Sequence, residues 1–246
     1  MDTAPFAAPA MRMLLLSNSR DTSGNYLVHA RSAWSEIARG CRTALFFPFA
    51  GTTMGWDDYG DLVREALASL QLDIRDAHHC DAPATAMAQA DLLLVGGGNT
   101  FRLLHELRRR GWLAPIRRAV QDGVPYVGWS AGTVVATPSI ATTNDMPIID
   151  PGGLDALNLF PLQVNAHYHD VLPPGHQGES RRQRIAEYLV LHPRATVLGL
   201  PEGNWIEVRN GQYHLCGPHP TWLFRSGIDP VALGKGPLPD AAPPCA

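Results

Sequence analysis

The chain has 246 residues, 45% hydrophobic and 17% charged, a composition that can bury a sizeable core and excludes a disordered chain. Its formal net charge is -3, from 20 basic and 23 acidic residues, so the charge favours neither a nucleic-acid nor a membrane partner. The four cysteines lack paired or metal-like spacing, and the N-terminal residues lack a signal-peptide pattern. We therefore expect free thiols and a cytoplasmic protein.

Short apolar runs that end in glycine, serine or proline alternate with helical patterns along most of the chain. This alternation predicts an α/β fold of three layers, with helices on both faces of a mostly parallel sheet. The expected buried strands are 11–17, 43–49, 91–96, 124–128 and 196–200. The expected helices are 59–70, 101–110, 113–121 and 180–192.

The pattern changes after residue 203. Residues 205–208, 212–215 and 221–224 are short apolar runs, and an Asn-Gly turn at 210–211 separates the first two. We expect them to form antiparallel strands that extend the edge of the sheet. We expect one hydrolytic domain over 11–227, and disordered tails at 1–10 and 237–246, which are rich in alanine and proline.

Residues 128–132 read Gly-Trp-Ser-Ala-Gly and directly follow an expected strand. They match the G-x-S-x-G nucleophile elbow, in which small residues allow a sharp strand-to-helix turn that exposes a serine. Ser130 is the candidate nucleophile. The amide N–H of Ala131, at the start of the next helix, is a natural donor to an oxyanion. An ordinary glycine-rich turn is the alternative.

Residues 96–98 are three glycines at the end of another expected strand. Glycines allow close backbone approach, so the amide of Gly98 is a candidate second oxyanion donor. Phosphate binding in a dinucleotide site is the rival, weakened by Phe101 where that motif has a glycine. A tight turn is the simplest alternative. Asn99 is a candidate helix cap and a candidate substrate ligand.

A serine nucleophile needs a general base, and His167 is the best candidate among ten histidines. His167 and His169 lie two residues apart and would face the same side of a strand. That spacing also suits a pair of metal ligands, but no cysteine or further close histidine completes a zinc set. Asp145 and Glu202 are both candidates to orient the base. We expect no metal and no organic cofactor.

A basic cluster opens the last expected helix. Arg181 and Arg184 lie on one helix face, and an arginine fork suits the recognition of a carboxylate. A solvated basic face is the ordinary alternative. Glu179 is a candidate partner for a substrate amino group.

Residues 11–227 together resemble the peptidase E family of α-aspartyl dipeptidases. The resemblance rests on the triple-glycine segment, the elbow, and residues 14–19, 48–51, 56–59, 142–147, 155–163 and 200–205. It implies a fold like that of class I glutamine amidotransferases, Ser130 as nucleophile, His167 as base, and either Asp145 or Glu202 as the third member. In the amidotransferases the acid lies two residues after the histidine, where this chain has His169.

The resemblance implies a serine peptidase that hydrolyses the bond after an N-terminal aspartate through an acyl-enzyme. Its expected partner is a small peptide substrate. One alternative is an acyl hydrolase like the related cyanophycinases, which act on β-aspartyl polymers. Another is a non-catalytic ligand-binding relative. The sequence leaves the oligomeric state open, with a homodimer as one expectation.

Overall fold

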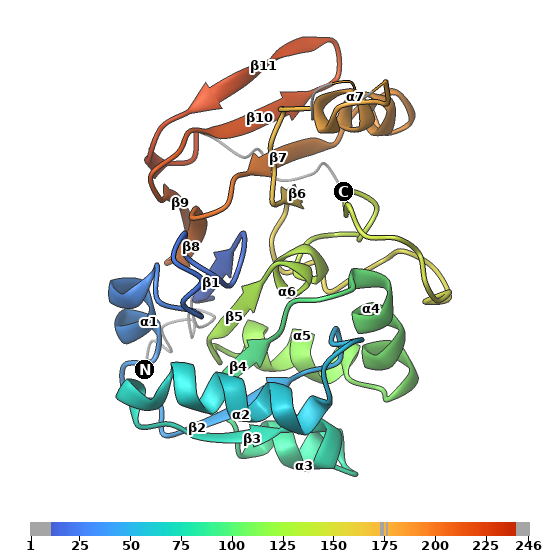
Figure 1. The fold of residues 1–246 in the computed structure, drawn as a ribbon. Helices are drawn as coiled ribbons and strands as arrows, with labels where there is room; N and C mark the ends of the chain where they lie inside the picture. The colour runs from blue at the N-terminus through green and yellow to red at the C-terminus, as the bar shows by residue number, and fades with distance from the viewer. Residues whose placement is uncertain (1–10, 173–174, 176, 240–246) are drawn as a thin grey trace, which may run out of the picture.

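The computed structural model describes residues 11–172, 175 and 177–239, and its largest element is a sheet of eight strands (Figure 1). In spatial order these are β12 (Gly236–Pro237), β9 (Gln212–Cys216), β8 (Trp205–Arg209), β1 (Met13–Leu16), β5 (Tyr126–Trp129), β4 (Leu92–Val95), β2 (Thr43–Phe47) and β3 (Asp73–Asp76). The run from β1 to β3 is parallel, whereas β8, β9 and β12 add an antiparallel edge. Parallel strands bring their carboxyl ends to one edge, where the candidate residues lie.

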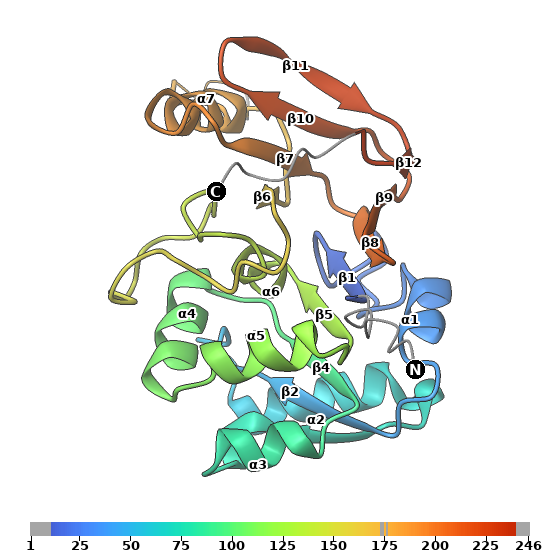
Figure 2. The ribbon, with the colours of Figure 1, turned by 180° about the vertical axis from the view of Figure 1, so that it is seen from behind.

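Helices cover both faces of this sheet because alternate residues of each strand point to opposite sides. Leu14 packs with Trp34 of α1 (Arg31–Ile37), while its neighbour Leu15 packs in the opposite core with Ile116 of α5 (Leu113–Gln121). Helix α2 (Trp56–Ala66) lies in front of the sheet in Figure 1, and α5 lies in front of it in Figure 2. The face of α5 also holds α3 (Pro83–Ala88), α4 (Thr100–Arg109) and α6 (Ala131–Val135). Short 3-10 turns, η1 (Ala68–Leu70) and η2 (Ala77–His79), flank β3.

A second sheet of four strands lies beyond the carboxyl end of β1. Its order is β11 (Ile228–Leu233), β10 (Thr221–Arg225), β7 (Thr196–Leu200) and β6 (Gln163–Ala166). Helix α7 (Arg181–Leu191) covers it with Ile185 and Leu189, which pack on Val197 and Phe224. The single sheet that we predicted is therefore wrong in this part. The edge of β1 that β7 could have joined is occupied by β8, so β7 pairs with β6 and β10 instead.

The predicted α/β class, with helices on both faces of a mostly parallel sheet, is confirmed. The ordered chain continues past the boundary expected at residue 227, through β11 and β12, and the N–H of Leu238 donates to the carbonyl of Tyr213 at 2.8 Å. The predicted tail at 1–10 and most of the one at 237–246 lie outside the described residues. Cys41, Cys80 and Cys216 are free thiols, and Cys245 is not among the residues described. Over the described ranges, no helix is both long and apolar enough to cross a membrane.

Candidate active site

Ser130 lies in a tight turn between β5 and α6. Its φ of 52° is in the left-handed region, which a residue other than glycine occupies only when its surroundings enforce it. Two close backbone approaches flank it here. A Cβ on Gly128 would lie 2.4 Å from the carbonyl oxygen of Gly132, and one on Gly132 would lie 2.1 Å from the carbonyl oxygen of Val95. The two glycines of the motif are therefore required by packing.

Gly128→Ala and Gly132→Ala are each expected to lower the free energy of unfolding by roughly 1–3 kcal/mol or more, since the added methyl group would overlap backbone atoms. Urea denaturation of the purified variants measures this change. Gly234→Ala is the matched control, because no atom lies within 4 Å of its added Cβ. Equal stabilities for all three variants would contradict the packing requirement.

His167 directly follows β6, and its ring reaches Ser130. Its Nε2 lies 2.8 Å from Ser130 Oγ, and its own φ of 53° is also left-handed. The backbone N–H of His167 donates to Ser17 Oγ at 2.9 Å, and this hydroxyl donates to the carbonyl of Leu200 at 2.7 Å. Buried Ser17 thus joins the ends of β1, β6 and β7 beneath the histidine. No sequence motif predicted a role for Ser17, although a serine that ends a wholly apolar strand was an available signal.

Glu202, and not Asp145, contacts the histidine. Glu202 Oε1 lies 2.7 Å from Nδ1 of His167, in a loop where the glutamate side chain is 65% exposed. An ionised carboxylate only accepts hydrogen bonds, so Nδ1 carries the ring proton and Nε2 is left to accept from the hydroxyl of Ser130. The three side chains form one hydrogen-bonded chain from carboxylate to hydroxyl.

Asp145 has a different set of partners. Its Oδ2 accepts from the backbone N–H of Thr100 at 2.7 Å and from the hydroxyl of the same residue. Thr100 is the first residue of α4, so the carboxylate satisfies a free amide at a helix N-terminus. The neighbouring Asn144 donates to the carbonyl of Ala166 at 2.9 Å, which ties the same loop to β6.

The triple-glycine loop packs against the nucleophile. A Cβ on Gly97 would lie 3.0 Å from Ser130 Cβ, and one on Gly98 would lie 2.3 Å from the carbonyl oxygen of Ala50. Gly98 also has a φ of 134°. Among the described residues, neither the N–H of Gly98 nor that of Ala131 has a protein acceptor. The oxyanion roles of these two amides remain predictions.

Two aromatic side chains support the triple-glycine loop, and no sequence motif predicted this role for them. The hydroxyl of Tyr59 donates to the carbonyl of Gly97 at 3.1 Å and accepts from the indole of Trp129 at 2.9 Å. Tyr59 comes from α2 and Trp129 from the elbow itself, which makes the position of the glycine loop depend on both elements. The available sequence signal was an aromatic residue in each of two motifs, Tyr59 in residues 56–59 and Trp129 in the elbow.

Arg181 lies half-buried beside the histidine. Its Nη1 donates to the carbonyls of Ala166 and His167, at the end of β6. Burial lowers the pKa of the guanidinium, while the carboxylates of Glu202 and Asp145 act in the opposite direction. An arginine stays protonated in spite of such a shift, so a positive charge is fixed next to the candidate base.

The remaining predicted residues lie at the margin of this group. Asn99 caps α4 by accepting from the N–H of Arg102 at 3.0 Å and donates to the carbonyl of Met146 at 2.9 Å. Glu179 and Arg184 are exposed near the start of α7. His169 is exposed, with Nδ1 3.2 Å from the carbonyl oxygen of Val171. The substrate contacts predicted for Asn99, Glu179 and Arg184 remain predictions.

The family model described as peptidase family S51 matches residues 13–216. A peptidase E from Salmonella arizonae is 52% identical over 226 residues, which is 92% of this chain and 99% of that protein. A peptidase E from Salmonella typhimurium has the same identity and coverage.

Two solved structures share the fold. A peptidase from an acI-B1 actinobacterium gives a TM-score of 0.65 at 14% identity, over 91% of this chain and 97% of that chain. A candidate peptidase E from Listeria monocytogenes EGD-e gives a TM-score of 0.61 at 24% identity, over 85% of this chain and 99% of that chain. At these identities the likeness bears on the fold alone.

Proposed function

The chain belongs to peptidase family S51 and is a serine peptidase, and from this premise we propose that it is a dipeptidase that cleaves after an N-terminal aspartate. The observation that carries the proposal is the hydrogen-bonded chain from Glu202 through His167 to Ser130, on an elbow whose glycines leave no room for side chains. Such a chain activates a serine hydroxyl for attack on a carbonyl carbon.

The proposed reaction proceeds through an acyl-enzyme. His167 Nε2 takes the proton of Ser130 Oγ as that oxygen attacks the peptide carbonyl, and Glu202 stabilises the imidazolium that forms. The N–H groups of Ala131 and Gly98 hold the oxyanion, and losing one such donor typically costs ~10²–10³ in rate. The imidazolium gives its proton to the leaving amine, and water then releases aspartate from Ser130.

The charges beside the nucleophile fit an N-terminal aspartate. Such a substrate carries a side-chain carboxylate and a free α-amino group, which need a positive and a negative partner respectively. Arg181 supplies a fixed guanidinium for the carboxylate. Asp145 lies in the loop that Asn144 ties to the carbonyl of Ala166, and this carbonyl also accepts from Arg181, which makes Asp145 a better partner for the amino group than exposed Glu179. We therefore propose that Asp145, and not Glu179, binds the α-amino group of the substrate.

Arg181→Met is expected to abolish most of the preference for aspartate. An Asn-leading substrate leaves the guanidinium poorly paired, and a hydrogen bond to a charged group contributes roughly 1.5–3 kcal/mol, or about 10–100-fold in kcat/KM. The measurement compares kcat/KM for Asp-, Asn- and Ala-leading dipeptides on the native chain and the variant. The exposed Arg184→Met is the matched control and should keep the preference. If Arg181→Met keeps it and Arg184→Met loses it, the carboxylate lies against Arg184.

Turnover of an aspartyl anilide tests the proposed function as a whole. Mass spectrometry of the quenched reaction should show an aspartyl group on the peptide that contains Ser130. An α-linked and a β-linked aspartyl dipeptide assayed in parallel separate the proposed activity from a cyanophycinase-like one. Cleavage of the β-linked compound alone, or equal cleavage of Asp- and Ala-leading dipeptides, would overturn the aspartyl dipeptidase assignment.

A further inference from the structure

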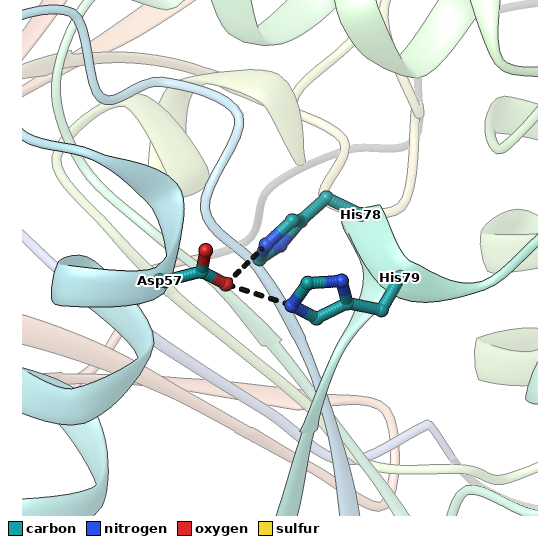
Figure 3. A group of neighbouring side chains, drawn as sticks. All are labelled: Asp57, His78 and His79. Carbon is teal, nitrogen blue, oxygen red and sulfur yellow. Dashed lines mark hydrogen bonds and ion pairs between the residues drawn. The ribbon is translucent and has the colours of Figure 1, made fainter.

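Outside the candidate active site, one carboxylate meets two histidines (Figure 3). Asp57 lies in the first turn of α2, and His78 and His79 are neighbours in η2, directly after β3. Asp57 Oδ1 lies 2.9 Å from Nε2 of His78 and 2.7 Å from Nε2 of His79. In Figure 3 both rings point toward the same carboxylate from the other side of a narrow gap.

The environment of His78 is unusual for a simple surface ion pair. Its side chain is only 9% exposed, and its buried Nδ1 has no hydrogen-bond partner among the described residues. The two rings lie with centroids 4.0 Å apart, so both imidazoles approach the carboxylate from the same side. The cluster thus brings one carboxylate oxygen and two imidazole nitrogens together at one place on the surface.

The three atoms are spaced like the ligands of a transition metal. All lie within 4.8 Å of one another, and each comes from a different side chain. Zinc takes imidazole nitrogen and carboxylate oxygen at about 2.0–2.2 Å, which in a tetrahedron sets ligand atoms roughly 3.3 Å apart. The present separations of 2.9 and 2.7 Å are the hydrogen-bonded lengths, and both need to open by only about half an ångström. Exposed Asp57 and His79 leave an entry path and room for a water ligand.

We propose that Asp57, His78 and His79 form a binding site for a divalent transition-metal ion such as Zn²⁺. The donor set of two imidazoles and one carboxylate selects this class over Mg²⁺ or Ca²⁺, which prefer all-oxygen ligands. On binding, the ring protons move from Nε2 to Nδ1 and the Nε2 lone pairs face the metal. The site is independent of the serine chemistry, and none of its residues belongs to the proposed catalytic group.

A metal ion at this site would connect two elements of the fold. It would join the N-terminal turn of α2 to the segment after β3, elements that Arg64 of α2 and Asp76 of β3 already connect through an ion pair of 2.9 Å. Tyr59, which supports the glycine loop beside Ser130, lies two residues after Asp57 on α2. Metal binding should therefore stabilise the packing of α2 against the segment after β3, and with it the glycine loop that Tyr59 supports.

Titration of the chelator-treated full chain with ZnCl₂ in a calorimeter tests the proposal. We expect one saturable site per chain, and an affinity at least about tenfold lower in His79→Asn and in Asp57→Asn, both exposed positions whose replacement leaves the core intact. His192→Asn, which removes an exposed histidine elsewhere, should bind zinc as the native chain does. Zinc should raise the Tm of the native chain and of His192→Asn, but not of the other two variants.

Three results would overturn the site. The first is the absence of saturable zinc binding to the native chain. The second is equal affinity in the native chain, His79→Asn and Asp57→Asn, which would place the ion elsewhere. The third is a response to MgCl₂ as strong as the response to ZnCl₂, which would contradict the assignment to imidazole ligands.

Discussion

Ser130→Ala is expected to hydrolyse Asp-leading dipeptides at least about 10⁴-fold more slowly than the native chain, with its stability preserved. The only hydrogen bond of the Ser130 side chain among the described residues joins it to His167, so the hydroxyl contributes little to packing. The close backbone approaches that flank this turn occur at Gly128 and Gly132, which the substitution does not touch. Any residual activity should come from substrate binding and from the proposed oxyanion donors.

Steady-state kinetics of the purified variant measure the loss of hydrolysis, and urea denaturation of the same preparation measures its stability. Ser226→Ala, at an exposed serine between β10 and β11, is the matched control and should keep full activity. A serine-directed fluorophosphonate should label the native chain and Ser226→Ala but not Ser130→Ala. A Ser130→Ala chain that is folded and keeps more than about a hundredth of the activity would show that another group is the nucleophile.

Local pattern sufficed to predict most of the elements that carry the site. The apolar runs before residues 98 and 130 become β4 and β5, two neighbouring parallel strands whose loops meet at one edge. The small residues of the elbow predicted its sharp turn because only glycine tolerates the observed backbone contacts. These features depend on residues a few positions apart, for which periodicity and steric size are informative.

Features that depend on distant pairings were not predictable in the same way. Glu202 and His167 are separated by 35 residues, and Ser17 and His167 by 150, and no local pattern encodes either contact. His167 contacts Glu202 and not Asp145 because β6 and β7 pair in parallel, which brings the residues after both strands together. The same pairing creates the second sheet that the strand pattern alone did not predict.

Arg181 and Arg184 show the limit of a helical pattern. The spacing placed both on one helix face and left a solvated basic face open as the alternative, but only Arg184 is exposed. Arg181 is instead half-buried, and its guanidinium donates to the carbonyl groups of Ala166 and His167 at the end of β6. The environment of Arg181 therefore depends on its place in the first turn of α7, next to the end of β6, more than on the neighbouring arginines in the sequence.

Glu202→Gln and Asp145→Asn are expected to damage catalysis in different ways. Glu202→Gln keeps the size of the side chain but lets the amide donate to Nδ1, which favours the wrong histidine tautomer, so kcat should fall by roughly 10²–10⁴-fold while KM changes by less than about threefold. We expect this fall in kcat to be no larger than the fall seen when a buried triad acid is replaced, because the side chain of Glu202 is largely exposed.

Asp145→Asn removes a negative charge near Arg181 without touching the histidine, so it should act on substrate binding. We expect KM for Asp-leading dipeptides to rise by about tenfold or more, with a smaller change in kcat. Glu187→Gln, at an exposed position of α7, is the control for loss of one surface charge. Michaelis–Menten curves for the three variants separate the two effects. If Asp145→Asn loses kcat while Glu202→Gln keeps it, then Asp145 positions the base during turnover, and its contact with Thr100 must exchange for one with His167.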